Sequence, residues 1–342
     1  MIASLRPRRV VALALLAASV ALTAPLAAAA APSSPTPTTG VTAPKPAPRP
    51  AITTVVLSAI NRPVRLGRSP VLLAGDRVRV RGILRHHVPR EHVVLTLLFR
   101  GRAVKTTTLP SFGRSTGVFA MTLTIGRPGR YLVRVTGVRG SPNPPVIGHA
   151  LGLLVVDGHS DSSASVSALE RGLGNLGYYV DFSGSYDLQT QLAVLAYRKV
   201  NGMDRTQSLD RGIIERVLRG GGAFHPRFPG AGRHVEANLA EQVVALINPG
   251  GHVFAVFPTS SGKPSTPTVL GSFNVDEKEP GYNSEEMFDS NYFYSGYAIH
   301  GYPDVPTYPA SHGCLRIPNS DAPFAFGWIQ YGTEVDVYGN AQ

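Results

Sequence analysis

The chain has 342 residues, of which 43% are apolar and 16% charged, and its net charge is +11. This composition supplies enough apolar side chain for real cores, so a wholly disordered chain is excluded, and the length allows two or three folded units. The only cysteine is Cys314, which excludes an intramolecular disulfide framework and any zinc site with several cysteine ligands.

Residues 1–31 have the composition of an export signal. Three arginines (Arg6, Arg8 and Arg9) precede an apolar stretch at 10–30 that ends in small residues at 27–31. This order is typical of a secretory signal peptide, although the stretch is also long enough to stay as an uncleaved membrane anchor. Both interpretations place the rest of the chain outside the cytoplasm, in the cell wall or periplasm. They argue against nucleic acid as a partner and limit membrane contact to an uncleaved signal.

Residues 32–50 consist mainly of Pro, Thr, Ser and Ala, with almost no bulky apolar side chain. Such a composition favours extended backbone and cannot bury a core. We expect this segment to be a linker between the signal and the first folded unit.

Residues 51–157 show short alternating runs separated by turns. Basic and apolar residues alternate with a period of two over 76–81, which is typical of a half-buried strand. Further strands are expected at 53–60, 92–99, 103–109, 118–125, 131–138 and 151–156. Seven short strands at this spacing predict an antiparallel, immunoglobulin-like β-sandwich without its disulfide.

Charge is unevenly distributed along the chain. Residues 51–157 carry a net charge of +13, residues 158–232 carry +1, and residues 233–342 carry −8. The basic sandwich is either a solvated surface or a site that attracts an anionic wall polymer or a phospholipid surface. The sequence leaves both interpretations open.

Residues 163–219 predict three short helices. Apolar residues recur at helical spacing in three groups: Val166, Leu169, Leu173 and Leu176; Leu188, Leu192 and Leu195; Ile213, Ile214, Val217 and Leu218. The first helix is expected to end at Gly177. The stretch containing LGYY resembles the three-helix peptidoglycan-binding-like module found beside cell-wall enzymes. The alternative is a structural spacer, because these leucines would form the core in both cases.

Residues 220–232 are rich in Gly and Pro and predict a second, flexible linker. The last domain, 233–340, is expected to be mostly β. Its predicted strands are 235–239, 243–247, 253–256, 293–300 and 334–338, and its one predicted helix is 320–330.

The chemistry is concentrated between residues 300 and 319. Cys314 follows His312 and Gly313 directly, and His300 lies fourteen positions before it. An unpaired cysteine is exceptional in an exported protein, and a thiol needs a neighbouring base to become a nucleophile near neutral pH. Gly313 has no side chain, so a carbonyl substrate can approach the local backbone amides, which are natural donors to an oxyanion.

The segment His300-Gly301…Ser311-His312-Gly313-Cys314 resembles the signature of the YkuD-like L,D-transpeptidases. Further resemblance extends over most of residues 233–340, including 261–264, 271–273 and 332–335. The resemblance implies a β-sandwich catalytic domain in which Cys314 is the nucleophile and His300 the general base and acid. The Gly301 carbonyl would orient the imidazole, and His312, Gly313 and the Cys314 amide would form the oxyanion site.

The same resemblance implies a substrate-binding set. Ser295 and Gly296 would lie along the donor stem peptide, Ser311 would support the site, and Arg316 would face the peptide carboxylate. Tyr282, Tyr292, Tyr294 and Tyr308 would line a groove, or would be ordinary half-buried aromatic residues of strands. The loop at 301–310 is short and rich in proline, which leaves the shape of the lid open.

Neither a metal nor an organic cofactor is expected. His300, His312 and Cys314 are metal-binding residue types, but the set lacks a fourth ligand and any common zinc spacing. Cys314 by itself could also be an inert buried thiol.

The predicted function is therefore that of an exported peptidoglycan L,D-transpeptidase. It would join the third residues of donor and acceptor stem peptides through a cysteine thioester, release D-alanine, and serve cell-wall biogenesis and cell shape. The resemblance also implies that a carbapenem would acylate Cys314. Two alternatives remain: an L,D-carboxypeptidase (or transfer to another amine) through the same thioester, and a non-catalytic scaffold that binds the cell wall.

Overall fold

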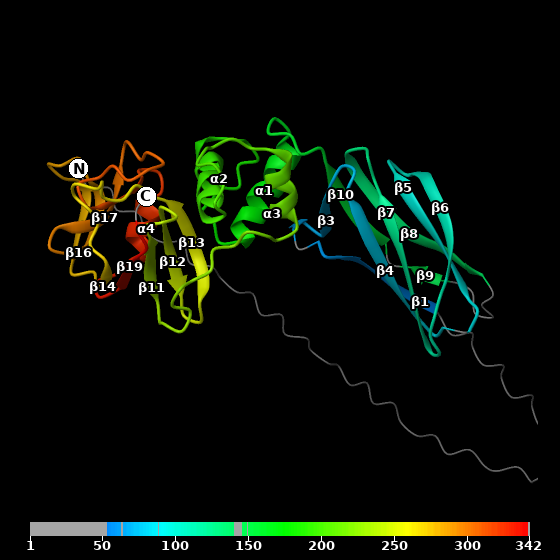
Figure 1. Ribbon diagram of the computed structural model, residues 1–342. Helices are drawn as coiled ribbons and strands as arrows, with labels where there is room; N and C mark the ends of the chain where they lie inside the picture. The colour runs from blue at the N-terminus through cyan, green and yellow to red at the C-terminus, as the bar shows by residue number, and fades with distance from the viewer. Residues whose placement is uncertain (1–52, 63, 88, 140–145, 149, 341–342) are drawn as a thin grey trace, which may run out of the picture. The chain divides into compact units, whose positions relative to one another are not determined.

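The computed structural model describes residues 53–340 except positions 63, 88, 140–145 and 149. The predicted signal segment and the first linker lie outside the described residues. The described residues cluster as one compact unit. In chain order this unit contains an N-terminal β-region, three helices and a C-terminal β-region, as labelled in Figure 1.

The N-terminal β-region consists of two sheets, with strand orders β7-β4-β1-β9 and β2-β3-β10-β8-β5-β6. Its strands are β1 (Thr53–Ile60), β2 (Arg65–Leu66), β3 (Ser69–Leu73), β4 (Arg77–Arg85), β5 (His92–Phe99), β6 (Arg102–Pro110), β7 (Thr116–Thr124), β8 (Gly129–Arg139), β9 (Val146–Gly148) and β10 (Ala150–Val156). All seven predicted strands are present. The purely antiparallel arrangement was wrong, because β1 pairs with β9, and β3 with β10, in parallel.

Alternation of side chains builds the core of this region. In β4, Val78 and Val80 are buried, whereas Arg77, Arg79 and Arg81 are exposed. Successive side chains of a strand point to opposite faces, so the period-two pattern places every second residue in the core. The same alternation leaves the arginines on the outer surface.

The three predicted helices are confirmed as α1 (Ser163–Asn175), α2 (Leu188–Val200) and α3 (Arg211–Leu218). Asp187 and Asp210 cap α2 and α3 by accepting hydrogen bonds from the backbone N–H groups of Thr190 and Ile213. Leu188 was expected on the buried stripe of α2, but its side chain is 60% exposed. It is the first helical residue after the cap and lies beyond the packed face.

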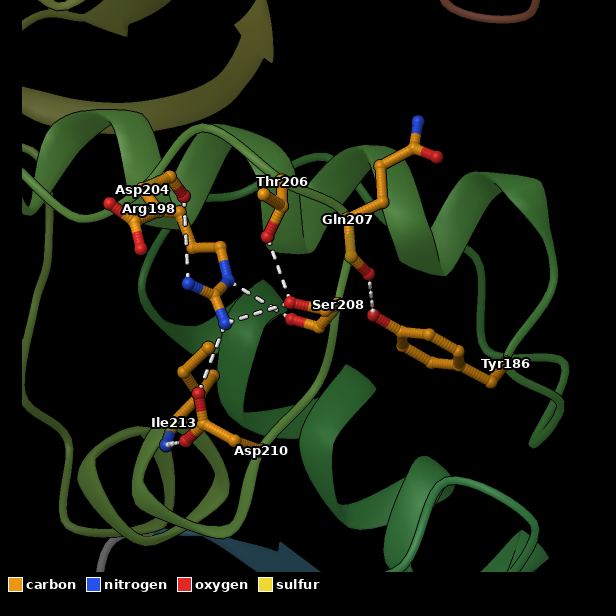
Figure 2. A network of polar contacts seen from close by, with 8 residues as sticks. All are labelled: Tyr186, Arg198, Asp204, Thr206, Gln207, Ser208, Asp210 and Ile213. Atoms are coloured by element: carbon orange, nitrogen blue, oxygen red, sulfur yellow. Dashed lines mark hydrogen bonds and ion pairs between the residues drawn. The ribbon is translucent and has the colours of Figure 1, made fainter.

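A buried arginine closes the loop between α2 and α3. Figure 2 shows the Arg198 guanidinium donating to the backbone carbonyl of Ser208 at 3.0 Å and to the Asp210 carboxylate, also at 3.0 Å. The Asp210 side chain also caps α3, so one ion pair ties the loop to both helices. Tyr186 donates to the Gln207 carbonyl and fixes the other side of the loop.

The helices share one apolar core with both β-regions. Leu73 and Leu154 of the N-terminal β-region belong to this cluster, as do Val243 and Val256 of the C-terminal β-region. Between α2 and the C-terminal β-region, the buried Lys199 amine donates to the carbonyls of Gln242 (3.1 Å) and Thr259 (2.8 Å).

Residues 220–232, expected to be flexible, are held by hydrogen bonds and packing. Tyr197 and Tyr178 donate to the carbonyls of Gly221 and Gly222, and Phe224 is buried in the shared core. The buried Glu236 carboxylate accepts the backbone N–H groups of residues 227 and 228 at 2.9 Å each. The composition of residues 220–232 does not predict these contacts, because the partner groups lie in other segments of the chain.

The C-terminal β-region contains two sheets, ordered β13-β12-β11-β19-β14 and β15-β16-β17-β18. The elements are β11 (His234–Asn238), β12 (Val243–Asn248), β13 (His252–Pro258), β14 (Gly271–Asn274), β15 (Glu277–Tyr282), β16 (Phe288–Tyr294), β17 (Tyr297–Tyr302), β18 (Leu315–Pro318), α4 (Ala322–Trp328) and β19 (Glu334–Tyr338). The predicted mostly β character and the predicted helix are confirmed.

The single strand expected at 293–300 was wrong. β16 and β17 form an antiparallel hairpin in which Tyr294 pairs with Tyr297. The two residues between them, Ser295 and Gly296, have φ values of 37° and 84°, which suits a tight two-residue turn. The apolar and aromatic residues on both sides of this turn made the run look continuous.

Candidate active site

Two neighbouring parallel strands bring the candidate residues together. β17 and β18 pair so that Ile299 lies opposite Leu315 and His300 opposite Arg316. Cys314 immediately precedes β18 and lies two positions before Arg316. A cavity of about 400 Å³ opens there, lined by Glu285, Met287, His300, Tyr302, Ser311, His312, Cys314 and Arg316.

His300 is held in one tautomer. Its side chain is only 2% exposed, and its Nδ1 lies 2.8 Å from the Gly301 carbonyl oxygen. A carbonyl can only accept, so Nδ1 carries the proton and Nε2 is left as the basic nitrogen. Burial lowers the pKa of His300 to about 4, with a smaller lowering from the Arg316 charge, so the imidazole is neutral at pH 7.

Cys314 is a protonated thiol at rest. Its Sγ lies 3.5 Å from the Gly296 carbonyl oxygen. Burial raises the pKa of the Cys314 thiol, and the Glu285 carboxylate adds to this, while a backbone hydrogen bond from Ala298 and the Arg316 charge oppose it. The site therefore holds a neutral thiol and a neutral imidazole rather than a preformed ion pair.

The turn before the cysteine is fixed by its own hydrogen bonds. The Ser311 hydroxyl donates to the Cys314 carbonyl at 2.6 Å and accepts from the Gly313 N–H at 3.0 Å. The Gly313 amide is thus already engaged, so of the expected oxyanion donors the Cys314 amide is the one that this turn leaves for the role.

A neighbouring segment, residues 261–268, supports this turn from outside. The buried Thr268 hydroxyl donates to the Gly313 carbonyl at 2.7 Å and accepts from the Gly262 N–H at 2.8 Å. The Ser311 carbonyl accepts from the Lys263 N–H at 3.0 Å and from the Thr266 hydroxyl at 3.1 Å. The segment was noticed in the sequence as part of a resemblance, but its supporting contacts were not predicted.

Gly313 is required by both conformation and space. Its φ of +130° is rare for residues with side chains, and a Cβ there would lie 2.7 Å from Cε1 of Tyr297. A larger residue would push the turn and the Cys314 thiol out of position.

The predicted substrate-binding residues divide into two groups. Ser311 and Arg316 line the cavity, and the Arg316 guanidinium lies 3.9 Å from the centre of the Tyr302 ring. Ser295 and Gly296 form the hairpin turn, of which only the Gly296 carbonyl approaches the thiol. Tyr282 does not line the cavity: its exposed ring packs on Phe288.

The other expected aromatic residues also lie outside this cavity. Tyr292 donates to the Glu279 carboxylate at 2.9 Å, and Tyr294 packs on Phe273. Tyr308 lines a separate hollow of about 440 Å³ together with Gly262 and Thr268. Gly262 and Thr268 belong to the supporting segment, and Thr268 also contacts the turn that carries Cys314.

His312 is exposed, and its Nε2 lies 3.2 Å from the Lys263 amine, whereas His300 is buried. The two histidines line the same cavity but differ in solvent contact and partners.

Sequence inspection missed three residues of the cavity, namely Glu285, Met287 and Tyr302. Tyr302 could have been found, because it lies two positions after His300 in the same strand and so shares its face. Glu285 and Met287 come from the segment before β16, and no local pattern connects them with residues 300–316.

Within the described ranges, no three His, Cys, Asp or Glu side chains lie close enough together to hold a metal ion. The described helices also include none that is long and apolar enough to cross a membrane.

Residues 232–337 match the family model of the YkuD L,D-transpeptidase catalytic domain. A solved L,D-transpeptidase from Xylanimonas cellulosilytica is 31% identical, over 51% of this chain and 92% of that one, with a TM-score of 0.47. One from Stackebrandtia nassauensis is 19% identical, over 54% and 96%, with a TM-score of 0.34. An L,D-transpeptidase in complex with imipenem is 15% identical, over 84% and 100%, with a TM-score of 0.28. No curated protein matches the chain.

Proposed function

Through residues 232–337 this chain belongs to the YkuD family of L,D-transpeptidases, and we propose that it cross-links peptidoglycan stem peptides through a thioester on Cys314. The family implies peptidoglycan as the substrate and an extracytoplasmic location. The exact reaction, the catalytic residues and the roles of the other regions are our proposals.

The observation that carries the proposal is the buried His300 beside the only thiol. The Gly301 carbonyl fixes the proton on Nδ1, so Nε2 keeps the lone pair, and His300 and Cys314 line the same cavity. This is the arrangement of a nucleophile, a base and an orienting group.

In the first half-reaction the Cys314 sulfur attacks the carbonyl of the donor stem's third residue. The thiol proton passes to His300 Nε2, and the oxyanion is stabilised by the Cys314 amide. The bond to the terminal D-alanine then breaks, and its nitrogen takes the proton back from His300. The products are free D-alanine and a thioester on Cys314.

In the second half-reaction an amine of a neighbouring stem attacks the thioester carbonyl. His300 accepts a proton from that amine and returns one to the departing sulfur, which restores the resting thiol. Because both resting groups are neutral, the Cys314–His300 pair begins and ends each half-reaction without a net charge.

The cavity also suggests how the donor is oriented. Arg316 is held against Tyr302 and presents a fixed positive charge, which suits the terminal carboxylate of the donor stem. Glu285 is the one carboxylate that lines the same cavity, and it would bind a positively charged group of the stem.

For the rest of the chain we retain the interpretations made from its sequence. Residues 1–31 would direct export, 32–50 would act as a linker, and 51–157 would be an immunoglobulin-like sandwich. Residues 163–219 would be a peptidoglycan-binding-like module, and 220–232 would connect it to the catalytic domain at 233–340.

Mass spectrometry of muropeptides tests this function. Wild type incubated with tetrapeptide-bearing muropeptides should yield dimers joined between third residues, together with free D-alanine. Cys314→Ala should yield neither, with an unchanged melting temperature. Shortened monomers without dimers would instead indicate an L,D-carboxypeptidase, and undiminished dimer formation by Cys314→Ala would refute the mechanism.

A carbapenem provides a second test of the nucleophile. The thiol should open the β-lactam ring and remain acylated, so the intact mass should rise by one adduct on the peptide that contains Ser311–Arg316. An adduct on another peptide would contradict the assignment of Cys314.

A further inference from the structure

The outer face of the six-stranded sheet contains a hollow of about 440 Å³ whose rim is basic. Arg100, Arg130 and Arg134 lie around it, and Leu98 and Leu132 contribute apolar surface. In β8, Tyr131, Val133 and Val135 are buried in the core, so Arg130, Leu132 and Arg134 must face outward. Gly152 and Ser69 also line the hollow, and a Cβ at Gly152 would lie 2.9 Å from the Ser69 hydroxyl.

A second hollow, of about 520 Å³, lies near the same β5–β6 turn but on the other side of β5, because Phe99 packs on Tyr131 and against the core whereas Leu98 faces outward. It is lined by Phe99, Arg100, Arg102, Val104 and Arg127, so Arg100 belongs to both. The guanidinium carbons of Arg100 and Arg127 lie 5.3 and 5.0 Å from the centre of the Phe99 ring. These cation–π contacts favour a fixed position for both charges. We call the hollow on the outer face, with Arg100, Arg130 and Arg134, the basic hollow; Arg102 and Arg127 line the second hollow.

The positive charge of the basic hollow has no internal partner. No carboxylate lines either hollow, and in the described part of the chain none of the five guanidiniums forms an ion pair. The three acidic residues of the N-terminal β-region are placed elsewhere: Asp76 pairs with Arg62 and Arg219, Asp157 accepts from Ser165, and Glu91 is buried.

Like charges so close together repel one another, and a bound anion relieves that repulsion. Guanidinium groups present a planar pair of donors that matches phosphate oxygens. We propose that the basic hollow binds a linear, phosphodiester-linked anionic polymer of the cell wall.

The shape favours a polymer over a membrane. Three arginines border one concave surface, which suits neighbouring phosphates of one chain, while Leu98 and Leu132 can contact the carbon units between them. A flat lipid headgroup layer would meet the rim of a hollow but not its floor. The cell wall is inferred as the location from the enzyme family. The anion site is inferred only from residues of the N-terminal β-region, so it does not depend on the catalytic proposal.

Two triple variants of the full chain make the test specific. R100Q/R130Q/R134Q removes three charges from the basic hollow. R81Q/R85Q/R114Q removes three exposed charges from β4 and from the loop before β7, none of which lines a hollow described above, and so serves as a control with the same net charge. All six side chains are exposed, so both variants should keep the wild-type melting temperature and turnover of soluble muropeptides.

Binding is measured with purified wall sacculi that retain their phosphodiester polymers, with the same sacculi after the polymers are stripped, and with vesicles containing anionic phospholipid. Because the first variant loses three exposed ion pairs with the polymer, its binding to intact sacculi should weaken by about tenfold to a hundredfold at low salt. The control should lose less than about threefold, and salt should release the wild type because surface charges are screened within about 10 Å at 0.1 M.

Several results would overturn the proposal. Equal losses in the two variants would show that net charge alone attracts the wall. Unchanged wild-type binding to stripped sacculi would show that the ligand is not the phosphodiester polymer. Binding to anionic vesicles but not to sacculi would assign the surface to a membrane.

The Cys314→Ala variant separates this proposal from the catalytic one. It is expected to lose cross-linking and to retain its binding to sacculi.

Discussion

The N-terminal and C-terminal β-regions both consist of two sheets, yet they place their polar side chains in opposite ways. In the first, which carries a net charge of +13, the arginines project from outward-facing strand positions and loops. In the second, polar groups are buried and bonded to one another, as at His300, Ser311 and Thr268. A buried network makes each position critical, whereas a solvated surface acts through the sum of its charges.

The largest effect short of removing the thiol is expected in the buried region. His300→Ala should lower the rate of cross-linking by about 100- to 10,000-fold, because it removes a positioned general base. His312→Ala is the matched control and should cost far less, since its ring is exposed and contacts Lys263. Rates measured with one muropeptide donor decide the ranking, and the reverse order would show that the base is His312.

The next effect tests whether the supporting segment positions the nucleophile. Thr268→Val leaves the Gly262 N–H and the Gly313 carbonyl without their shared partner, so turnover should fall by about five- to thirtyfold, which corresponds to about 1–2 kcal/mol. Thr266→Val should do less, because the Ser311 carbonyl still accepts the Lys263 N–H. If both variants turn over as fast as the wild type, the segment 261–268 does not position the nucleophile.

In the N-terminal β-region a single substitution should matter little. Arg130→Gln is expected to weaken binding to intact sacculi by no more than about fivefold, the value of one exposed ion pair of about 1 kcal/mol, and to leave turnover unchanged. A co-sedimentation titration provides the measurement. A hundredfold loss from this one change would mean that Arg130 acts like a buried residue, and the contrast between the regions would fail.

The smallest effect concerns pH. Burial lowers the pKa of His300 to about 4 and raises the pKa of the Cys314 thiol, so both groups keep their resting protonation states between pH 5.5 and pH 7.5. Arg316, Tyr302 and Glu285 line the same cavity. The kcat/KM for the donor should therefore change less than about twofold over this range and fall only as the pH approaches 4, where His300 gains a proton. An acid limb near 6.5 would show a solvated histidine.

Local patterns were sufficient for the elements whose side chains repeat regularly. The period-two run in β4 and the helical spacing of Val166, Leu169 and Leu173 were interpreted correctly, because these patterns reflect burial on one face. The run at 293–300 was misinterpreted, because apolar residues continue through the turn at Ser295 and Gly296. Hydrophobicity by itself does not reveal where the backbone reverses its direction.

The sequence by itself determined which residues are candidates for the chemistry: it supplied one thiol, a preceding glycine, and a histidine at a recognisable spacing. Only the tertiary structure decided how these residues are arranged. Pairing of β17 with β18 brings His300 and Cys314 together, the Gly301 carbonyl fixes the tautomer, and burial sets both pKa values. The meeting of Arg100 from the β5–β6 turn with Arg130 and Arg134 of β8 in one basic hollow was likewise invisible in the sequence. Residue type is a local property, whereas proximity and desolvation arise from contacts between segments far apart in the chain.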